Sequence, residues 1–207
     1  MASPLLDVTD LACRRGGRPV FQGLSFRLGA GELLALTGRN GSGKTTLLRT
    51  LALLIRPVSG RIAWHGAQVQ DDPEGWRGRL AWLGHLDGLK GDLTVRENLA
   101  AAERLRGRTA APEAIDAALA AFDLGPLAGR PVRSLSAGQR RRTALARVRL
   151  GGAPLWLLDE PLNALDAVAQ QALRAVLLEH LAAGGLVVAS THVDLGLPGS
   201  RRLELGA

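Results

Sequence analysis

The segment Gly38–Thr45, with the sequence G-R-N-G-S-G-K-T, constrains the fold of this chain more than any other. It matches the phosphate-loop pattern G-x-x-x-x-G-K-[ST] at every fixed position. Glycines let backbone N–H groups approach phosphate oxygens, Lys44 suits the β- and γ-phosphates, and the Thr45 hydroxyl can ligate Mg²⁺. The pattern predicts a nucleotide-phosphate site formed by Gly38, Arg39, Asn40, Gly41, Ser42, Gly43, Lys44, Thr45 and Thr46.

The residues that flank this loop fit the same site. Glu32–Thr37 is a short apolar run typical of a buried parallel strand, and Thr45–Ile55 predicts the helix that follows it. The free N–H groups at the start of that helix, together with the positive end of its dipole, would face the phosphates. A glycine turn that matches the pattern by chance is the alternative, and motifs farther along the chain disfavour it.

Strand and helix patterns alternate along most of the 207 residues, which predicts an α/β fold with a core of parallel strands. A stretch rich in helical patterns, roughly residues 86–150, predicts an α-helical subdomain inserted in one domain that spans residues 1–207. We expect strands at Leu5–Leu11, Gly23–Leu28, Arg61–His65, Leu80–Leu83, Leu155–Leu158 and Leu186–Ser190, helices within Glu97–Asp123 and at Ser136–Leu150 and Asp166–Ala183, a turn at Arg14–Arg18 and a polar loop at Asp71–Gly78.

Composition limits the other possibilities. The net charge of +7 comes almost entirely from arginine, because lysine occurs only at Lys44 and Lys90. The arginines are dispersed, which favours solvated faces over a nucleic-acid interface, so we expect no nucleic-acid partner. The single cysteine, Cys13, excludes an internal disulfide. No apolar run approaches the ~20 residues that span a bilayer, and Met1–Asp10 lacks the features of a signal peptide.

Two adjacent carboxylates follow the apolar run Leu155–Leu158. The end of a parallel strand releases such side chains at the edge of the sheet where phosphates bind. We expect Asp159 to hold the Mg²⁺ shell with Thr45, directly or through water, and Glu160 to polarise the attacking water as general base. A strand capped by two solvated acids is the alternative, which the phosphate loop makes the weaker one.

A second helix start able to bind an anion has the sequence L-S-A-G-Q. Its serine and glutamine have capping-box spacing, which predicts that a helix begins here. One nucleotide cannot easily use two such helix starts within one subunit, so we expect the second to act on a nucleotide held by another copy of the chain. A plain helix cap is the alternative. The residues are Leu135, Ser136, Ala137, Gly138 and Gln139.

In order and spacing, Gly38–Thr45, Leu135–Gln139, Leu155–Glu160 and His192 resemble the ATP-binding subunit of an ABC transporter over nearly the whole chain. The resemblance implies a P-loop NTPase fold with a RecA-like core, an antiparallel β subdomain and a helical subdomain. It implies ATP and Mg²⁺ as ligands, and a head-to-tail dimer with two ATP molecules between Lys44 of one subunit and Ser136 of the other. It also implies a switch histidine, His192, at the γ-phosphate, and a D-loop across the dimer interface formed by Asn163, Ala164, Leu165 and Asp166.

The chain departs from the family pattern at two positions. Where the family places a glutamine that senses Mg²⁺ and the attacking water, Leu80–Gly84 is followed by His85. Imidazole titrates near neutral pH, so turnover could depend on pH; the alternative is that His85 is a surface residue and the sensor lies elsewhere. The family also stacks an aromatic ring on adenine. The matching position is Arg15, whose guanidinium can stack on a flat ring, and Phe21 is a second candidate.

The departure at His85 narrows the resemblance to one group of the family. Gly84–Leu99, Gln139–Arg147 and Leu155–Pro161 are similar to the ATP-binding subunit of the haem exporter in bacterial cytochrome c maturation. This implies a peripheral protein on the cytoplasmic face of the inner membrane, with integral membrane permease subunits of that system as partners. Dimer closure would then drive haem export or release of a haem chaperone. The four histidines show no axial-ligand pairing, so we expect no direct haem binding.

Three other functions stay open. The ATPase of another ABC importer or exporter, for a lipid, peptide, ion or drug, would use the same chemistry with a different membrane partner. A soluble ABC ATPase that acts on nucleic acid or ribosomes normally has paired domains or a long inserted coiled coil, and this chain has neither. A kinase or GTPase built on the same loop would not need Leu135–Gln139, and no guanine-reading N-K-x-D segment is present.

Overall fold

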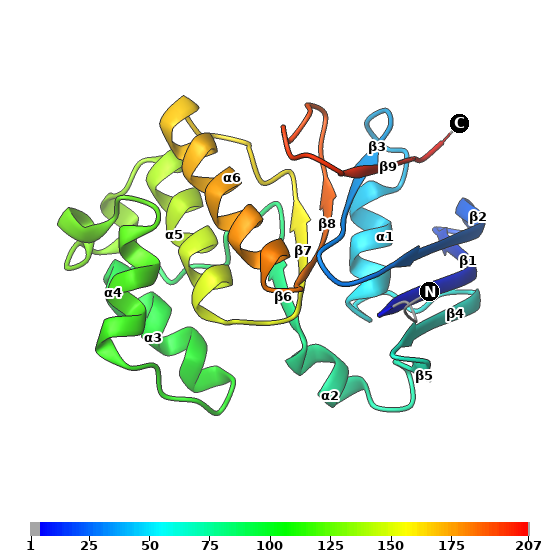
Figure 1. The fold of residues 1–207 in the computed structure, drawn as a ribbon, viewed down its shortest axis with the longest axis horizontal. Coiled ribbons are helices and arrows are strands. Elements are labelled where there is room, and N and C mark those ends of the chain that lie inside the picture. Colours follow the sequence, from blue (N-terminus) through cyan, green and yellow to red (C-terminus); the bar gives the residue numbers. More distant parts are fainter. Residues whose placement is uncertain (1–4, 207) are drawn as a thin grey trace.

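The computed structural model describes residues 5–206 and contains a parallel sheet, an antiparallel sheet and helices around them (Figure 1). Residues 1–4 and 207 lie outside this description, and with them the start of the segment where we expect no signal peptide. Every neighbouring pair of strands in the order β6-β7-β8-β3-β9 is parallel. The strands are β3 Leu33–Thr37, β6 Leu80–Leu83, β7 Leu155–Asp159, β8 Leu186–Ser190 and β9 Arg201–Glu204.

The parallel sheet confirms the predicted α/β class, and four of its strands occur where the apolar runs are. The fifth, β9, is missing from the sequence prediction. It pairs with β3 at the edge of the sheet, and most of its residues are exposed. An edge strand of this kind needs no continuous apolar run, so its sequence, R-R-L-E, gives no periodic signal.

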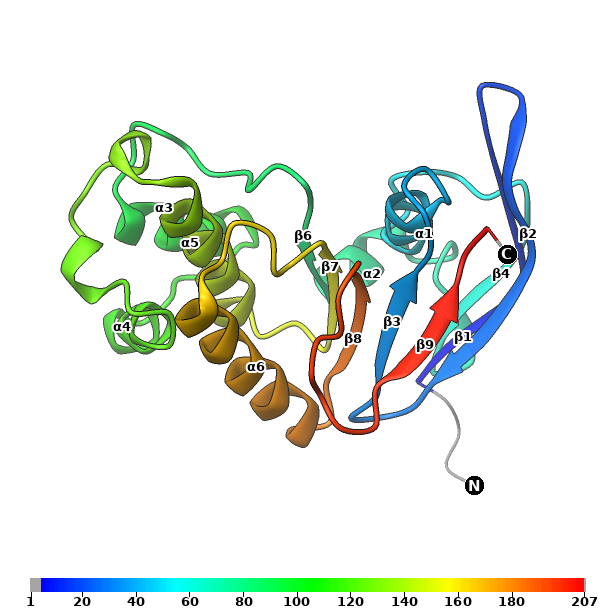
Figure 2. The same cartoon turned by 90° about the horizontal axis from the view of Figure 1, so that it is seen from above.

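Helices cover both faces of the parallel sheet, with α1 Lys44–Leu51 on one face and α5 Ala137–Leu150 and α6 Ala167–Ala182 on the other (Figure 2). Leu33 of β3 belongs to the core that includes α5 and α6, whereas the next residue, Leu34, belongs to the core that includes α1. Consecutive strand residues thus enter opposite cores, as burial on both faces requires.

The antiparallel sheet, in the order β2-β1-β4-β5, shares its core with α1. Its first two strands are longer than predicted, because the turn between them is the pair Gly16-Gly17 and not the whole of Arg14–Arg18. Both glycines have positive φ, +55° and +79°, as tight hairpin turns require. The strands are β1 Leu6–Arg15, β2 Arg18–Leu28, β4 Ser59–Trp64 and β5 Ala67–Gln68.

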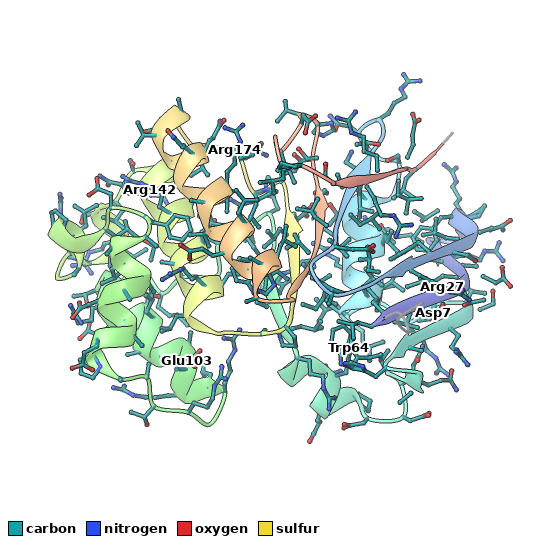
Figure 3. The ribbon with its side chains drawn as sticks, viewed as in Figure 1. Asp7, Arg27, Trp64, Glu103, Arg142 and Arg174 are labelled. Carbon is teal, nitrogen blue, oxygen red and sulfur yellow. The ribbon has the colours of Figure 1, made fainter. Side chains whose placement is uncertain are left out.

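Pairing between β1 and β2 continues up to Arg15, which lies opposite Arg18. This extension matters because it carries Arg15 well beyond the predicted end of the strand. Farther along the same ladder, Asp7 and Arg27 are registered partners, and Figure 3 shows them close together on the antiparallel sheet. The Arg27 Nε atom lies 3.1 Å from Asp7 Oδ2, so an ion pair joins the two strands.

The helix after the phosphate loop is shorter than expected, since α1 ends at Leu51 and not at Ile55. Leu53 adopts a left-handed conformation, with φ of +54°, which closes the helix. The backbone N–H of Leu54 donates to the carbonyl of Arg49 at 2.9 Å, so the final carbonyls are satisfied by this turn.

The polar loop predicted at Asp71–Gly78 is wrong, because this segment contains the helix α2 Pro73–Gly78. Asp72 caps the helix by accepting a hydrogen bond from the Gly75 N–H at 2.9 Å, and a proline suits the first helical turn. Trp76 is buried on the inner face of α2. The pair Asp72-Pro73 is a typical helix start, but the polar composition of the segment led to the prediction of a loop.

The helices α3 Val95–Leu105 and α4 Pro112–Ala120 lie with α5 on the far side of the parallel sheet from the antiparallel strands (Figures 1 and 2). The continuous helical pattern of Glu97–Asp123 is therefore divided between two helices. Short 3-10 turns at Gly125–Leu127 and Val132–Ser134 lead from α4 to α5. Among residues 5–206, none of the helices combines the length and apolar character that crossing a bilayer requires.

Capping boxes begin two of these helices. Thr94 and Glu97 form the box of α3, and hydrogen bonds from the Thr94 backbone and side chain lower the pKa of the Glu97 carboxyl from its ordinary value. Ser136 and Gln139 form the box of α5, in which the Gln139 N–H donates to Ser136 Oγ at 3.2 Å. The helix start predicted at Ser136 is confirmed.

Candidate nucleotide site

A cavity of about 680 Å³ lies where the strands β3, β7 and β8 end. It gathers most of the side chains that the sequence predicts for a nucleotide, from segments far apart in the chain. Two further residues of its wall, Val20 and Arg49, were not predicted. The predicted residues that line it are Arg15, Asn40, Gly41, Ser42, Gly43, Lys44, Thr45, Thr46, His85, Asp159, Glu160, Asn163 and His192.

The phosphate loop joins β3 to α1 through a backbone that only glycine adopts easily. Gly38, Gly41 and Gly43 have φ of +126°, +84° and +104°. A Cβ on Gly43 would lie 2.6 Å from Val20 Cγ1, and one on Gly38 would lie 2.3 Å from the Leu205 carbonyl oxygen. Side chains at these two positions are therefore excluded by space as well as by φ.

Lys44 is the first residue of α1 and is 7% exposed. Its ammonium donates to the Gly38 carbonyl at 2.8 Å and to the Arg39 carbonyl at 3.2 Å. Gly38 and Arg39 thus hold the Lys44 ammonium through their backbone carbonyls, and neither residue lines the cavity. An ammonium has three N–H donors, so the third can serve a phosphate oxygen.

The amino end of α1 is prepared for an anion. Its N-cap is Gly43, and no side chain accepts a hydrogen bond from its first turn. By contrast, side chains of Thr94, Ser136 and Asp166 cap α3, α5 and α6. The first N–H groups of a helix have no partner within it, and they bind phosphate well. The cavity wall formed by Gly43–Thr46 thus fits a polyphosphate.

Asp159 and Thr45 meet at the same wall. The Thr45 hydroxyl donates to the Asp159 carboxylate, with Oγ1 2.9 Å from Oδ2 and 3.0 Å from Oδ1. The Ser190 hydroxyl donates to Asp159 Oδ1 at 2.6 Å and fixes the carboxylate from the other side. Mg²⁺ prefers oxygen ligands and commonly takes one or two protein groups, with phosphate oxygens and water for the rest.

This donor set fits Mg²⁺ bound together with a nucleotide. Within residues 5–206, no cluster of three or more His, Cys, Asp or Glu side chains could hold a metal ion without such help. Mg²⁺ at this wall would be held by Thr45, Asp159, oxygens of the nucleotide and water.

Glu160 follows Asp159 in a left-handed conformation, with φ of +48°. Its N–H donates to the Ser190 hydroxyl at 2.9 Å, which holds the turn. The Glu160 Oε1 atom lies 3.1 Å from His192 Nε2, and both side chains line the cavity. A non-glycine residue in this region of φ costs about 1–3 kcal/mol and is typical of functional sites. Because of this turn, Asp159 and Glu160 both line the cavity although they are consecutive residues.

The predicted residues at the two departures from the family pattern, and those of the D-loop, lie partly in the cavity wall and partly outside it. His85 and Arg15 both line the cavity, whereas Phe21 does not appear in its wall. Asn163 is the D-loop residue that lines it. Leu165 is buried, Asp166 caps α6 by accepting from the Ala169 N–H at 2.8 Å, and Ala164 has positive φ.

The five residues Leu135–Gln139 lie outside this cavity. Gly138 packs on the D-loop so closely that a Cβ there would lie 2.7 Å from the Ala164 carbonyl oxygen. Leu135 is buried, while Ser136 and Ala137 are exposed. The start of α5 is therefore exposed but does not contribute to the nucleotide wall of its own chain.

Sequence reasoning missed two residues that hold the site. Ser190 ends β8 and contacts both Asp159 and Glu160, but a serine at the end of a buried strand gives no functional signal. Arg141 donates to the backbone carbonyls of Asp159 and Glu160 at 2.6 and 2.7 Å. In the sequence it is one of several arginines in α5, and only the folded structure distinguishes it from the others.

Comparisons with known proteins agree on the kind of molecule. A family model described as "ABC transporter" matches residues 21–163. The chain is 53% identical over 196 residues to "Cytochrome c biogenesis ATP-binding export protein CcmA" of Rhodospirillum rubrum, covering 95% of this chain and 83% of that protein. It is 50% identical over 207 residues to the protein of the same name from Paramagnetospirillum magneticum, covering 99% and 95%.

Solved structures give the same picture. A structure described as the ATP-binding subunit of an ABC transporter superposes with a TM-score of 0.87 at 28% identity, covering 97% of this chain and 85% of that one. An ABC transporter ATP-binding protein from Pyrococcus furiosus superposes with a TM-score of 0.86 at 26% identity, covering 97% and 96%.

Proposed function

The chain belongs to the ABC transporter family, and we propose that it is the ATP-hydrolysing subunit of a haem exporter in cytochrome c maturation. ATPase subunits of this family work as dimers with membrane permease subunits. The observation that carries the proposal is one cavity in which Lys44, Asp159, Glu160 and His192 meet. High identity to cytochrome c biogenesis export proteins over almost the whole chain supports a role in haem export over transport of another substrate.

We assign the steps of hydrolysis to the residues of this cavity. The N–H groups of Gly43–Thr46 and the Lys44 ammonium bind the β- and γ-phosphates. Thr45 and Asp159 would hold Mg²⁺, which supplies charge neutralisation at the phosphates when bound. The Glu160 carboxylate takes a proton from the attacking water. His192, 3.1 Å from Glu160, orients that carboxylate and can reach the γ-phosphate side of the cavity.

The second half of each ATP site comes from another copy of the chain. The segment Leu135–Gln139 contains the exposed start of α5, yet it lies outside the cavity of its own chain. Two copies arranged head to tail would bring Ser136 of each to the nucleotide of the other, with Asn163 at the boundary. ATP binding closes this dimer, hydrolysis opens it, and the permease subunits convert the movement into haem export or release of a haem chaperone.

The site also leaves room for the base of the nucleotide. Arg15 reaches the cavity because the β1–β2 hairpin extends to the turn Gly16-Gly17. A guanidinium can stack on the flat adenine ring, so we assign this contact to Arg15 in preference to Phe21, which does not line the cavity.

The identity of the permease separates this proposal from its alternative, another ABC importer or exporter. We expect the tagged chain, purified from detergent-solubilised bacterial membranes, to bring along integral membrane proteins of cytochrome c maturation. Deletion of the gene should also abolish covalent attachment of haem to c-type cytochromes. The proposed role in haem export would be contradicted by recovery of permease subunits for a lipid, peptide, ion or drug, together with normal c-type cytochromes in the deletion strain. We expect the chain at the cytoplasmic face of the inner membrane, held there by these partners.

A substitution at His85 tests the least usual residue of the site. His85 lines the cavity where the family has glutamine, and an imidazole can bind a proton whereas an amide cannot. We expect His85→Gln to change the pH–rate profile of ATP turnover. The matched control is His65→Gln, because His65 is exposed in the turn between β4 and β5 and does not line the nucleotide cavity. Identical pH–rate profiles for His85→Gln and the unsubstituted protein would exclude His85 from the reaction.

A further inference from the structure

The guanidinium of Arg141 is buried between three segments of the chain, with 6% of the side chain exposed. It lies on α5 and donates to four oxygen atoms. Nη2 donates to the carbonyls of Asp159 and Glu160, at 2.6 and 2.7 Å. Nη1 donates to the carbonyl of Gly84 at 2.9 Å and to Asp87 Oδ1 at 3.2 Å. Only a flat fork of donors can serve acceptors arranged in this way, so lysine is no equivalent.

The contacts of Arg141 complete a clamp around the turn that carries Glu160. On the amino side of this residue, the N–H donates to Ser190 of β8. On the carboxyl side, the carbonyl accepts from Arg141 of α5. Between these two contacts the backbone has a φ of +48°, which an unrestrained glutamate rarely adopts. The clamp therefore fixes the backbone from which the Glu160 side chain enters the cavity.

The same guanidinium reaches the segment that carries His85. Gly84, whose carbonyl accepts from Arg141, immediately precedes His85, and Asp87 lies two residues after it. His85 and Glu160 line the cavity from different segments, and Arg141 is bonded to the backbone of both. A displacement of α5 would therefore move both walls of the cavity together.

The helix that carries Arg141 is also the helix that begins at Ser136. The capping box fixes its first turn, and Arg141 lies on the buried side a little farther along. We propose that Arg141 is a positioning residue for ATP hydrolysis, which holds the Glu160 carboxylate in place and links it to the position of α5. The inference rests on the proposed function, in which Glu160 is the general base and the start of α5 meets the nucleotide of the other copy.

The link gives each subunit a way to sense the partner's nucleotide. When Ser136 engages ATP bound to the other copy, α5 is held, and through Arg141 the Glu160 turn of the same subunit is held as well. When that ATP is absent, α5 and the turn are free to shift together. Misplacement of a reacting group by about 1 Å can reduce a rate roughly 100-fold, so a small shift suffices.

The test compares Arg141→Gln with Arg142→Gln in the assembled transporter. Arg142 is the next residue of α5 and also donates to a backbone carbonyl, that of Phe122 at 3.0 Å. Figure 3 shows Arg142 in the helical part of the molecule. Both variants lose one charge and carbonyl contacts, but only Arg141 touches the Glu160 turn. We expect Arg141→Gln to lower kcat about tenfold or more at unchanged ATP affinity, and Arg142→Gln to change kcat much less.

A second comparison separates positioning from general loss of structure. In a background of Glu160→Gln, where the carboxylate is gone, Arg141→Gln should cause no further loss of the residual hydrolysis. An equal fractional loss in both backgrounds would overturn the inference, and so would equal kcat values for the Arg141 and Arg142 variants. Normal hydrolysis by Glu160→Gln would contradict the role of Glu160 as general base. If Glu160→Gln is inactive but the Arg141 and Arg142 variants behave alike, only the positioning role of Arg141 is contradicted.

Loss of the buried cation leaves Asp87 without its partner, so Arg141→Gln can fail to fold. Arg141→Lys keeps the charge beside Asp87 but cannot reach all the carbonyls at once. The kcat of this variant should fall several-fold, with ATP affinity preserved. A kcat equal to that of the unsubstituted transporter would overturn the positioning role.

Discussion

Substitution of Glu160 by Gln is expected to reduce ATP hydrolysis by the assembled transporter about 100-fold or more while ATP still binds. The glutamine side chain has the same shape, so it can keep its place in the cavity and its neighbour His192, at 3.1 Å. It cannot accept a proton from the attacking water, because an amide is not a base at neutral pH. Steady-state turnover and equilibrium binding of labelled ATP measure the two effects separately.

The matched control for this variant is Glu179→Gln. Glu179 lies on α6 and forms an ion pair with Arg149 at 3.1 Å, and it does not line the nucleotide cavity. The same chemical change there should leave turnover nearly intact. Normal turnover in Glu160→Gln would remove this residue from the role of base, whereas loss of ATP binding would show that the substitution disturbed the cavity itself.

Substitution of Lys44 by Ala is expected to weaken ATP binding by about 2–4 kcal/mol, roughly 30- to 1,000-fold, because a buried, charge-assisted contact to phosphate is lost. The effect has two sources. The ammonium no longer meets the phosphates, and the carbonyls of Gly38 and Arg39 lose the donor that braces the loop. Calorimetric titration of the purified chain with ATP measures the affinity.

The chain offers an unusually clean control, because Lys90 is its other lysine. Lys90 is exposed and does not line the cavity, so Lys90→Ala removes the same charge without touching the loop. Its ATP affinity should match that of the unsubstituted chain. If Lys44→Ala also binds ATP with full affinity, the phosphate loop does not hold the nucleotide as proposed.

The sequence predicts the parts of this molecule that depend on local pattern. The phosphate loop needs glycines at fixed positions, and the structure has positive φ at Gly38, Gly41 and Gly43. The start of α5 needs Ser136 and Gln139 three residues apart, and the capping box is present. The parallel strands are apolar because they are buried on both faces, so β7 and β8 could be located from composition alone.

The parts that escaped prediction depend on tertiary contacts. The strand β9 forms at a sheet edge where its exposed residues need no pattern. The extension of β1 to Arg15 depends on a two-residue turn, and a run of basic residues conceals it. Nothing in the spacing of α5 shows that Arg141, rather than its neighbour Arg142, turns toward Asp159 and Glu160. Such roles follow from which elements pack together, and a single sequence does not display that.

The central claim is that ATP binds between two copies of this chain, each of which supplies what the other lacks. The most direct measurement is the mass in solution of Glu160→Gln, by light scattering, with and without Mg²⁺ and ATP. We predict a mass of two chains with Mg²⁺ and ATP, which falls to one when Ser136→Arg is added to block the contact with the partner's nucleotide. Two results together would contradict the claim. The isolated chain would have the mass of one chain under every condition, and the assembly with the membrane subunits would contain only one copy of it.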